Sequence, residues 1–134
     1  MRAAILAALV SCAGFGVQAA TLGEEAQFVI NSMGGGNFEV IRQRQMGTVE
    51  LWCAAASYVE ARRGLSETTP IYLRSPLGPA KTAKGRQGVV FSLSRAGLPA
   101  TPRRNTLTVE VVGTMVKSAT ARRFCRDAFT RSTK

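Results

Sequence analysis

The sequence predicts a single α+β domain in which an antiparallel sheet of about four strands packs against a central helix and a C-terminal helix. Apolar residues recur at helical spacing in residues 48–63 and 118–129, whereas several shorter segments alternate in the manner of strands. Cys53 lies in the first helical segment and Cys125 in the second. Strands that are segregated from helices, without a regular alternation of the two, are typical of α+β proteins.

The first twenty residues predict an export signal. Arg2 precedes an apolar run from Ala3 to Val17, and Val17-Gln18-Ala19 fits the small-x-small pattern that a signal peptidase cuts. The run is shorter than the roughly 20 residues needed to span a bilayer. We therefore expect residues 1–19 to be removed and residues 20–134 to form one domain, periplasmic or secreted, with no transmembrane segment in the mature chain.

Leu9-Val10-Ser11-Cys12 offers an alternative, because it resembles the lipobox of bacterial lipoproteins, in which the cysteine is lipidated and becomes the new N-terminus. The apolar stretch ahead of Cys12 is short for a signal core, so simple cleavage after Ala19 is the preferred interpretation. A lipid on Cys12 would instead tether the protein to the inner or the outer membrane.

Cys53 and Cys125 are the cysteines that remain after simple cleavage, and we expect them to form a disulfide. In the chain-entropy model a loop of this length stabilises the fold by about 4 kcal/mol. The alternative, a free catalytic thiol, is disfavoured because the sequence contains no histidine to act as its base.

The segment before residue 37 is predicted to be a helix. Thr21-Leu22-Gly23-Glu24 fits the capping box, in which a threonine and a glutamate three residues later satisfy each other's backbone N–H groups. Gly34-Gly35-Gly36 is typical of a helix end followed by a flexible turn. The apolar positions between them recur at spacings of three and four and are Leu22, Ala26, Val29, Ile30 and Met33.

Two further helices have clearer ends. In the central one Thr48 can act as the N-cap, Glu50 lies in the first turn, and Gly64 is the expected left-handed terminator. Its three consecutive alanines, Ala54–Ala56, would allow another element to approach closely. Ser118 can cap the last helix, whose apolar face consists of Ala121, Phe124, Cys125, Ala128 and Phe129.

Four segments are predicted to be strands: residues 37–45, 70–75, 88–95 and 106–112. The first reads as half-exposed, with Arg42 and Arg44 pointing to the same side. The connections 76–86 and 99–105 contain prolines and several positive charges, and we expect the former to be exposed.

The absence of histidine excludes serine–histidine and cysteine–histidine catalysis and nearly all catalytic zinc sites, so we expect neither a metal nor a cofactor. A pair of carboxylates remains conceivable as acid and base. Its members would come from Glu39, Glu50, Glu60 and Glu110. A small secreted hydrolase or toxin-like enzyme is therefore the alternative function.

The positive charge is the main functional indication. Removing residues 1–19 takes away Arg2 and no acidic residue, so the formal charge falls only from +10 to +9. Such a charge favours anionic partners. The candidate anion-binding residues are Lys81, Lys84, Arg86, Arg103, Arg104, Arg122, Arg123 and Arg126.

We therefore expect a non-enzymatic binding or accessory protein of a bacterial envelope, whose partner is an anionic envelope component, either lipid head groups or polysaccharide, or another protein. Nucleic acid is not the expected partner, because the aromatic residues that would stack on bases, such as Trp52, Phe124 and Phe129, fall on predicted inner faces.

Overall fold

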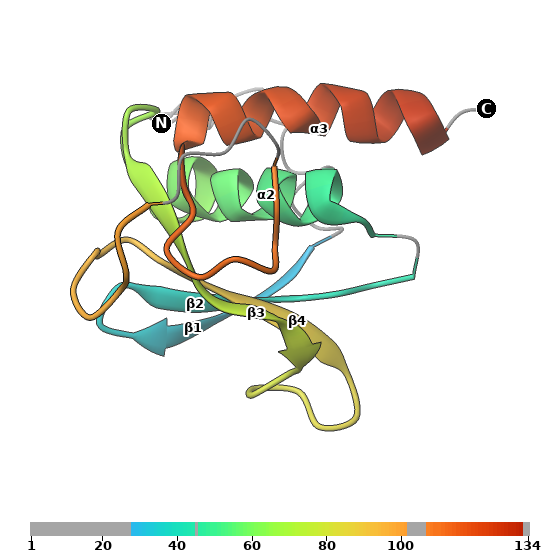
Figure 1. The fold of residues 1–134 in the computed structure, drawn as a ribbon. Helices are drawn as coiled ribbons and strands as arrows, with labels where there is room; N and C mark the ends of the chain where they lie inside the picture. Colours follow the sequence, from blue (N-terminus) through green and yellow to red (C-terminus); the bar gives the residue numbers. More distant parts are fainter. Residues whose placement is uncertain (1–27, 45, 102–106, 133–134) are drawn as a thin grey trace, which may run out of the picture.

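The computed structural model describes residues 28–44, 46–101 and 107–132, with side chains described as far as Arg126. They form the predicted α+β domain, in which a five-stranded antiparallel sheet, a helix on that sheet and a second helix above the first make three layers (Figure 1). The strand order is β1-β2-β4-β3-β5. The elements are β1 (Val29–Gly34), β2 (Asn37–Ile41), α2 (Thr48–Ser57), the π-helical turn η1 (Tyr58–Arg62), β3 (Pro70–Pro79), β4 (Gln87–Ser92), β5 (Met115–Lys117) and α3 (Ser118–Ser132).

The β1–β2 hairpin replaces the helix that the sequence predicted before residue 37. Gly34 pairs with Asn37, which leaves Gly35 and Gly36 as a two-residue loop with φ of +61° and +80°. Positive φ at both positions is what a tight hairpin turn needs, and glycine adopts it without strain. The helix prediction is therefore wrong for residues 29–33, and its first part, residues 21–27, lies outside the described residues.

β2 is a strand as predicted, but it is not half-exposed. Four of its five residues are buried, so both of its faces are covered. The strand ends at Ile41, and the exposed residues Arg42 and Arg44 belong to the connection that follows.

α2 begins after Gly47, whose backbone N–H donates a 2.8 Å hydrogen bond to Glu50 Oε2, so glycine, not Thr48, occupies the cap position. Its last turn widens into η1, where the N–H of Arg63 donates to Tyr58 O at 2.9 Å. Gly64 then ends the helix in the left-handed conformation, with φ of +63°, as predicted.

The main core lies between α2 and the sheet. Trp52 meets Phe91 of β4 edge to face, with ring centroids 4.9 Å apart. Phe38 of β2 stacks on Tyr58 at 4.2 Å. These rings fix α2 and η1 against the inner strands β2 and β4, because buried aromatic pairs contribute beyond the apolar area that they cover.

The strand predicted at residues 106–112 does not form in the described part, 107–112. The Thr108 hydroxyl accepts a 3.0 Å hydrogen bond from the N–H of Glu110 and turns the chain, while the indole N–H of Trp52 donates to Thr108 O at 2.9 Å. Val109 is nevertheless buried, and its carbonyl oxygen accepts a 2.9 Å hydrogen bond from the N–H of Leu77 in β3, so this residue contacts the core and the sheet without forming a strand. The fifth strand is β5, which pairs with the start of β3.

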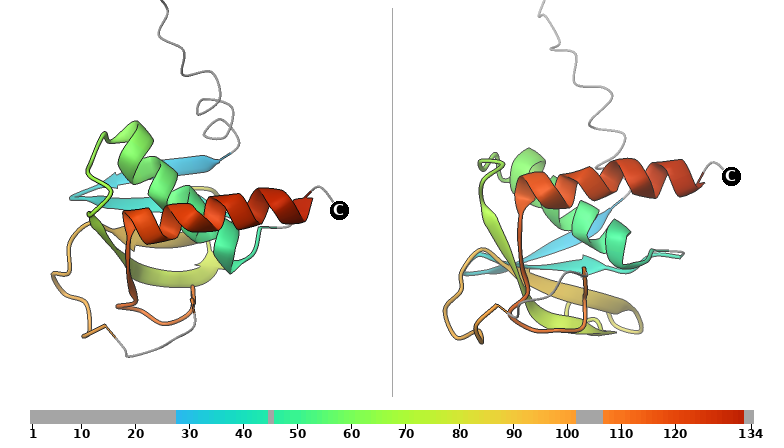
Figure 2. Two further views of the ribbon diagram at one scale, coloured as in Figure 1. Left: turned by 90° about the horizontal axis from the view of Figure 1, so that it is seen from above. Right: turned by 45° about the horizontal axis from the view of Figure 1, so that its top comes forward.

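α3 packs on α2, obliquely across it when seen from above (Figure 2). The predicted Cys53–Cys125 disulfide joins the two helices, with Cα atoms 4.8 Å apart. Ala54–Ala56 and Ala121 are fully buried, and such small side chains let the helix backbones come close.

Arg62, at the end of η1, reaches the edge strand β1. Its guanidinium donates to the carbonyl groups of Phe28 at 3.0 Å and Ile30 at 3.2 Å. Two carbonyl groups at the margin of the sheet are thereby bonded to a side chain from the helical layer.

Candidate functional site

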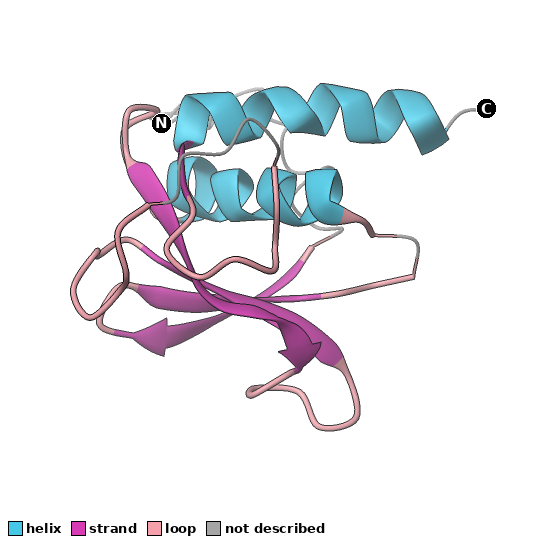
Figure 3. Cartoon of the chain, in the orientation of Figure 1, coloured by secondary structure: helices cyan, strands magenta, loops and turns pink. Residues whose placement is uncertain are grey.

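The connection between β3 and β4, residues 80–86, lies on the side of the sheet away from both helices (Figure 3). We call it the basic loop, because it carries Lys81, Lys84 and Arg86, all of them exposed as predicted. It covers Glu39 on the second face of β2 and so accounts for the unexpected burial of that residue.

Glu39 holds the basic loop in place. This glutamate of β2 is only 1% exposed. Its Oε2 accepts a 2.8 Å hydrogen bond from the N–H of Lys81, and its Oε1 accepts bonds from the N–H of Thr82 at 2.8 Å and the Thr82 hydroxyl at 2.6 Å. Gly88 on the neighbouring strand leaves room for this side chain, since an added Cβ would lie 3.0 Å from the carboxyl group.

Burial raises the pKa of Glu39, but the hydrogen bonds from Lys81 and Thr82 and the nearby Lys81 charge outweigh that effect and leave the pKa below its usual value of 4.5. The buried carboxylate is therefore ionised at neutral pH. Its negative charge faces the backbone N–H groups of Lys81 and Thr82 in the basic loop.

Further contacts define the loop. Asn31 of β1 donates to the Thr82 hydroxyl at 2.8 Å, and the N–H of Ala80 donates to Arg86 O at 2.8 Å. Lys81 Nζ donates to Ser75 Oγ at 3.0 Å. These hydrogen bonds hold the backbone of the basic loop in one conformation, and the loop carries its cationic side chains on that fixed backbone.

Arg42 joins the cations of the loop. Its Nη1 donates to Gln87 Oε1 at 2.9 Å and its Nε to Met46 O at 2.9 Å, while Arg86 Nη2 donates to Arg42 O at 3.3 Å. Arg42 thus lies beside Arg86, and we call Arg42 together with the three exposed cations of the basic loop, Lys81, Lys84 and Arg86, the basic cluster.

The other candidate cations lie elsewhere. Arg122, Arg123 and Arg126 are on α3, which is separated from the basic loop by the sheet and α2 (Figure 1). Arg122 forms ion pairs with Glu60 at 3.0 Å and Glu67 at 3.2 Å. Arg103 and Arg104 lie outside the described residues.

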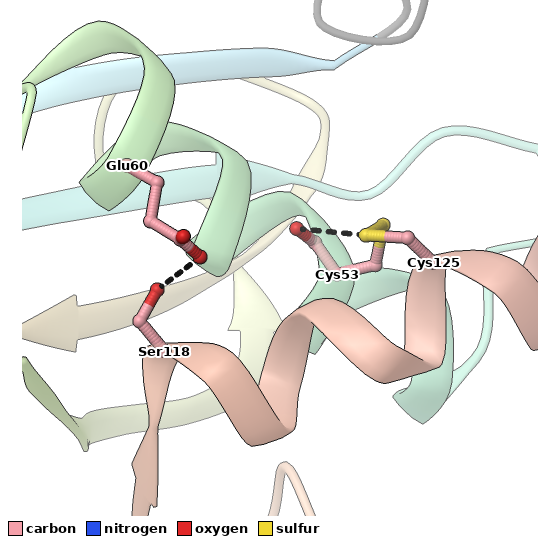
Figure 4. The surroundings of a disulfide bond; sticks show 4 residues. All are labelled: Cys53, Glu60, Ser118 and Cys125. Atoms are coloured by element: carbon pink, nitrogen blue, oxygen red, sulfur yellow. Dashed lines mark hydrogen bonds between the residues drawn. A yellow bond between two sulfur atoms is a disulfide. The ribbon is translucent and has the colours of Figure 1, made fainter. Parts of the chain in front are cut away.

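α3 is attached to α2 by the disulfide and to η1 by Glu60 (Figure 4). Glu60 Oε2 accepts a 2.8 Å hydrogen bond from the hydroxyl of Ser118, which is fully buried. Cys125 Sγ lies 3.6 Å from Cys53 O. Because the Ser118 hydroxyl and Arg122 both bind Glu60, this carboxylate has a structural role in attaching α3.

The remaining candidate acid–base residues are Glu50, Glu110 and Glu39, and Glu50 and Glu39 bond to backbone N–H groups. Glu50 binds the N–H of Gly47 at the start of α2, and Glu110 is exposed in the segment after Thr108. Glu39 has a lowered pKa, whereas a general acid at neutral pH needs a raised one.

No family model, curated protein or solved structure matches this chain. Across residues 28–44, 46–101 and 107–132, none of the helices combines the length and apolar character that a membrane span requires. Among the side chains that the structure describes, the last of which is Arg126, no three of the types Cys, Asp, Glu and His gather into a set that could hold a metal ion.

The sequence predicted the three cations of the basic loop as candidates. It did not predict that Arg42 lies beside Arg86 or that Glu39 binds the backbone of the loop. A signal for Glu39 was present, since it is the acidic residue in the middle of the apolar strand Asn37-Phe38-Glu39-Val40-Ile41. A carboxylate among buried apolar residues needs donors, and the nearby basic loop supplies them.

Proposed function

We propose that this protein is a non-enzymatic binding or accessory protein of the bacterial envelope, which contacts an anionic partner through the basic cluster. The observation that carries the proposal is the anchoring of the loop by Glu39. A buried carboxylate bonded to two backbone N–H groups orders a segment whose side chains are cationic and exposed. Ordering before binding lowers the entropy cost of binding.

The disulfide supports the proposed location. Cys53 and Cys125 are bonded to each other, and such bonds persist in oxidising compartments such as the periplasm or the exterior of the cell. The leader at residues 1–19, and with it the choice between cleavage after Ala19 and lipidation of Cys12, is part of the same proposal and lies outside the described residues.

The test measures affinity for heparin, a soluble polyanion, over a range of salt concentrations. We expect the affinity to fall steeply as salt rises, because exposed charges are screened over about 10 Å at 0.1 M. The triple variant Lys81→Gln, Lys84→Gln, Arg86→Gln should bind at least about tenfold more weakly, since each exposed cation near an anionic surface contributes about 1 kcal/mol.

The matched control removes the same amount of charge elsewhere, by Arg63→Gln, Arg95→Gln and Lys117→Gln, all at exposed positions outside the basic cluster. If the two triple variants lose affinity equally, net charge alone is responsible and the basic cluster is not a site. An affinity that does not change with salt would also contradict the proposal.

The carboxylate-dependent hydrolase gains no support from the described residues. Among the glutamates that the structure describes, Glu39 and Glu60 have several protein donors, and they hold the basic loop and α3 in place.

A further inference from the structure

β1 carries the two large apolar side chains that are exposed in the described part of the chain. Val29 is 43% exposed and Met33 is 38% exposed. Both lie on the edge strand, at its beginning and beside its turn, and the core between the sheet and α2 does not use them.

The strand register places Val29 on the same side of the sheet as the basic loop. Val29 pairs with Ile41 and Asn31 pairs with Glu39, and paired residues in antiparallel strands project from the same face. Glu39 is the residue that the basic loop covers, and Asn31 bonds directly to Thr82 of that loop.

The alternate residues of these strands point the other way. Ile30 pairs with Val40, and both belong to the core that packs beneath α2. The face with Val29 and the basic loop is therefore turned away from both helices (Figure 1).

Met33 lies next to this face. It is two residues beyond Asn31, at the irregularity in the pairing between Ser32 and Gly34. Apolar side chains on β1 thus flank the residue that joins the strand to the basic loop.

We propose that this face docks onto an anionic lipid bilayer, with the basic cluster contacting phosphate head groups and Val29 and Met33 entering the interfacial region. This inference rests on the proposed function and names the partner. Cations attract a protein to a negatively charged leaflet, and adjacent apolar groups gain free energy by leaving water there. A soluble polysaccharide would offer the charge without an apolar phase, and so would leave the two exposed side chains without a role.

The test compares vesicles of phosphatidylcholine alone with vesicles that also contain phosphatidylglycerol, in a sedimentation assay. Wild-type protein should bind only the anionic vesicles. The variant Val29→Thr, Met33→Gln keeps side-chain size and removes apolar character, and it should bind these vesicles about tenfold more weakly while its heparin affinity stays unchanged. The control variant Val29→Ile, Met33→Leu should bind them as wild type does.

The outcomes separate the two proposals. Lipid docking is wrong if wild type binds heparin through the basic cluster but does not bind anionic vesicles. It is also wrong if the variant Val29→Thr, Met33→Gln binds vesicles as well as wild type does. In both cases the proposed anion-binding function stands. If wild type binds neither heparin nor anionic vesicles, both proposals fail. A thermal melt of each variant confirms that the β1–β2 hairpin and the domain remain folded.

Discussion

Replacing Glu39 by glutamine tests whether this buried carboxylate anchors the basic loop. The glutamine carbonyl oxygen can still accept both bonds from Thr82, whose donors lie 2.8 Å and 2.6 Å from Glu39 Oε1. Its amide group, however, would face the N–H of Lys81, which now donates at 2.8 Å to Oε2, so a donor would meet a donor. Losing one charge-assisted bond and leaving an N–H unsatisfied should cost about 2 kcal/mol.

The cost should depend on pH. Because the pKa of Glu39 is lowered in the folded protein, its ionised form stabilises the fold fully above the usual value of 4.5, and this contribution is lost as the pH falls through the folded-state pKa. Glutamine does not titrate. The difference in unfolding free energy between wild type and Glu39→Gln should therefore be largest at neutral pH and become smaller below about pH 4.5.

The assay is urea unfolding of both proteins at neutral pH and at several acidic pH values, with the disulfide intact. In a thermal melt at neutral pH, the same loss of about 2 kcal/mol should appear as a melting temperature about 10 °C lower for a domain of this size. Glu110→Gln is the matched control, because it removes one exposed negative charge and should change stability by less than about 0.5 kcal/mol. Equal stability of wild type and Glu39→Gln at neutral pH, or a deficit that does not change with pH, would refute the anchoring role.

Three further predictions concern the attachment of α3 and the turn before β5. Replacing Cys53 and Cys125 together by serine should lower the unfolding free energy by about 4 kcal/mol, as measured by urea unfolding against the oxidised wild type; an unchanged midpoint would contradict a stabilising bridge. Gly113→Ala should destabilise by about 2 kcal/mol or more in the same assay, because Gly113 has φ of +91° and an added Cβ would lie 2.6 Å from Pro99 O; a neutral effect would show that this turn adjusts freely. Arg122→Ala should cost no more than about 1 kcal/mol, since its side chain is 58% exposed and water screens its ion pairs, and a much larger loss in thermal or urea melts would show that this pairing holds α3 in place.

The sequence predicted the fold class, the two helices and the bridge between them because the signals for these features are local and agree with one another. In the central helix, for example, the buried run Leu51–Ala56 and the terminator Gly64 indicate the same element. The cysteines fall on helices that small side chains allow to approach, so the covalent link fits the packing.

The errors arose where tertiary pairing decides between alternatives. Residues such as Val29 and Ile30 suit a helical stripe and a strand equally, and only their pairing with Ile41 and Val40 makes them a strand. Val109 shows the opposite case: it is buried in an alternating segment and its carbonyl oxygen accepts a hydrogen bond from the N–H of Leu77, but Thr108 turns the backbone and no strand forms. At the candidate site, the basic loop was visible as composition, but its contact with Glu39 spans 42 residues of sequence and depends on the folded sheet.

Arg62 occupies backbone carbonyl groups at the β1 edge of the sheet, which affects how readily another chain could pair with that edge. A free edge strand is a template onto which another chain can add, and this is a common route to aggregation. Here the carbonyl oxygens of Phe28, just before β1, and of Ile30, within it, accept hydrogen bonds from the Arg62 guanidinium, as they would from the N–H groups of an adjoining strand. An incoming chain would have to displace this guanidinium from both carbonyl oxygens before it could extend the sheet there, so we expect Arg62 to disfavour self-association through this edge.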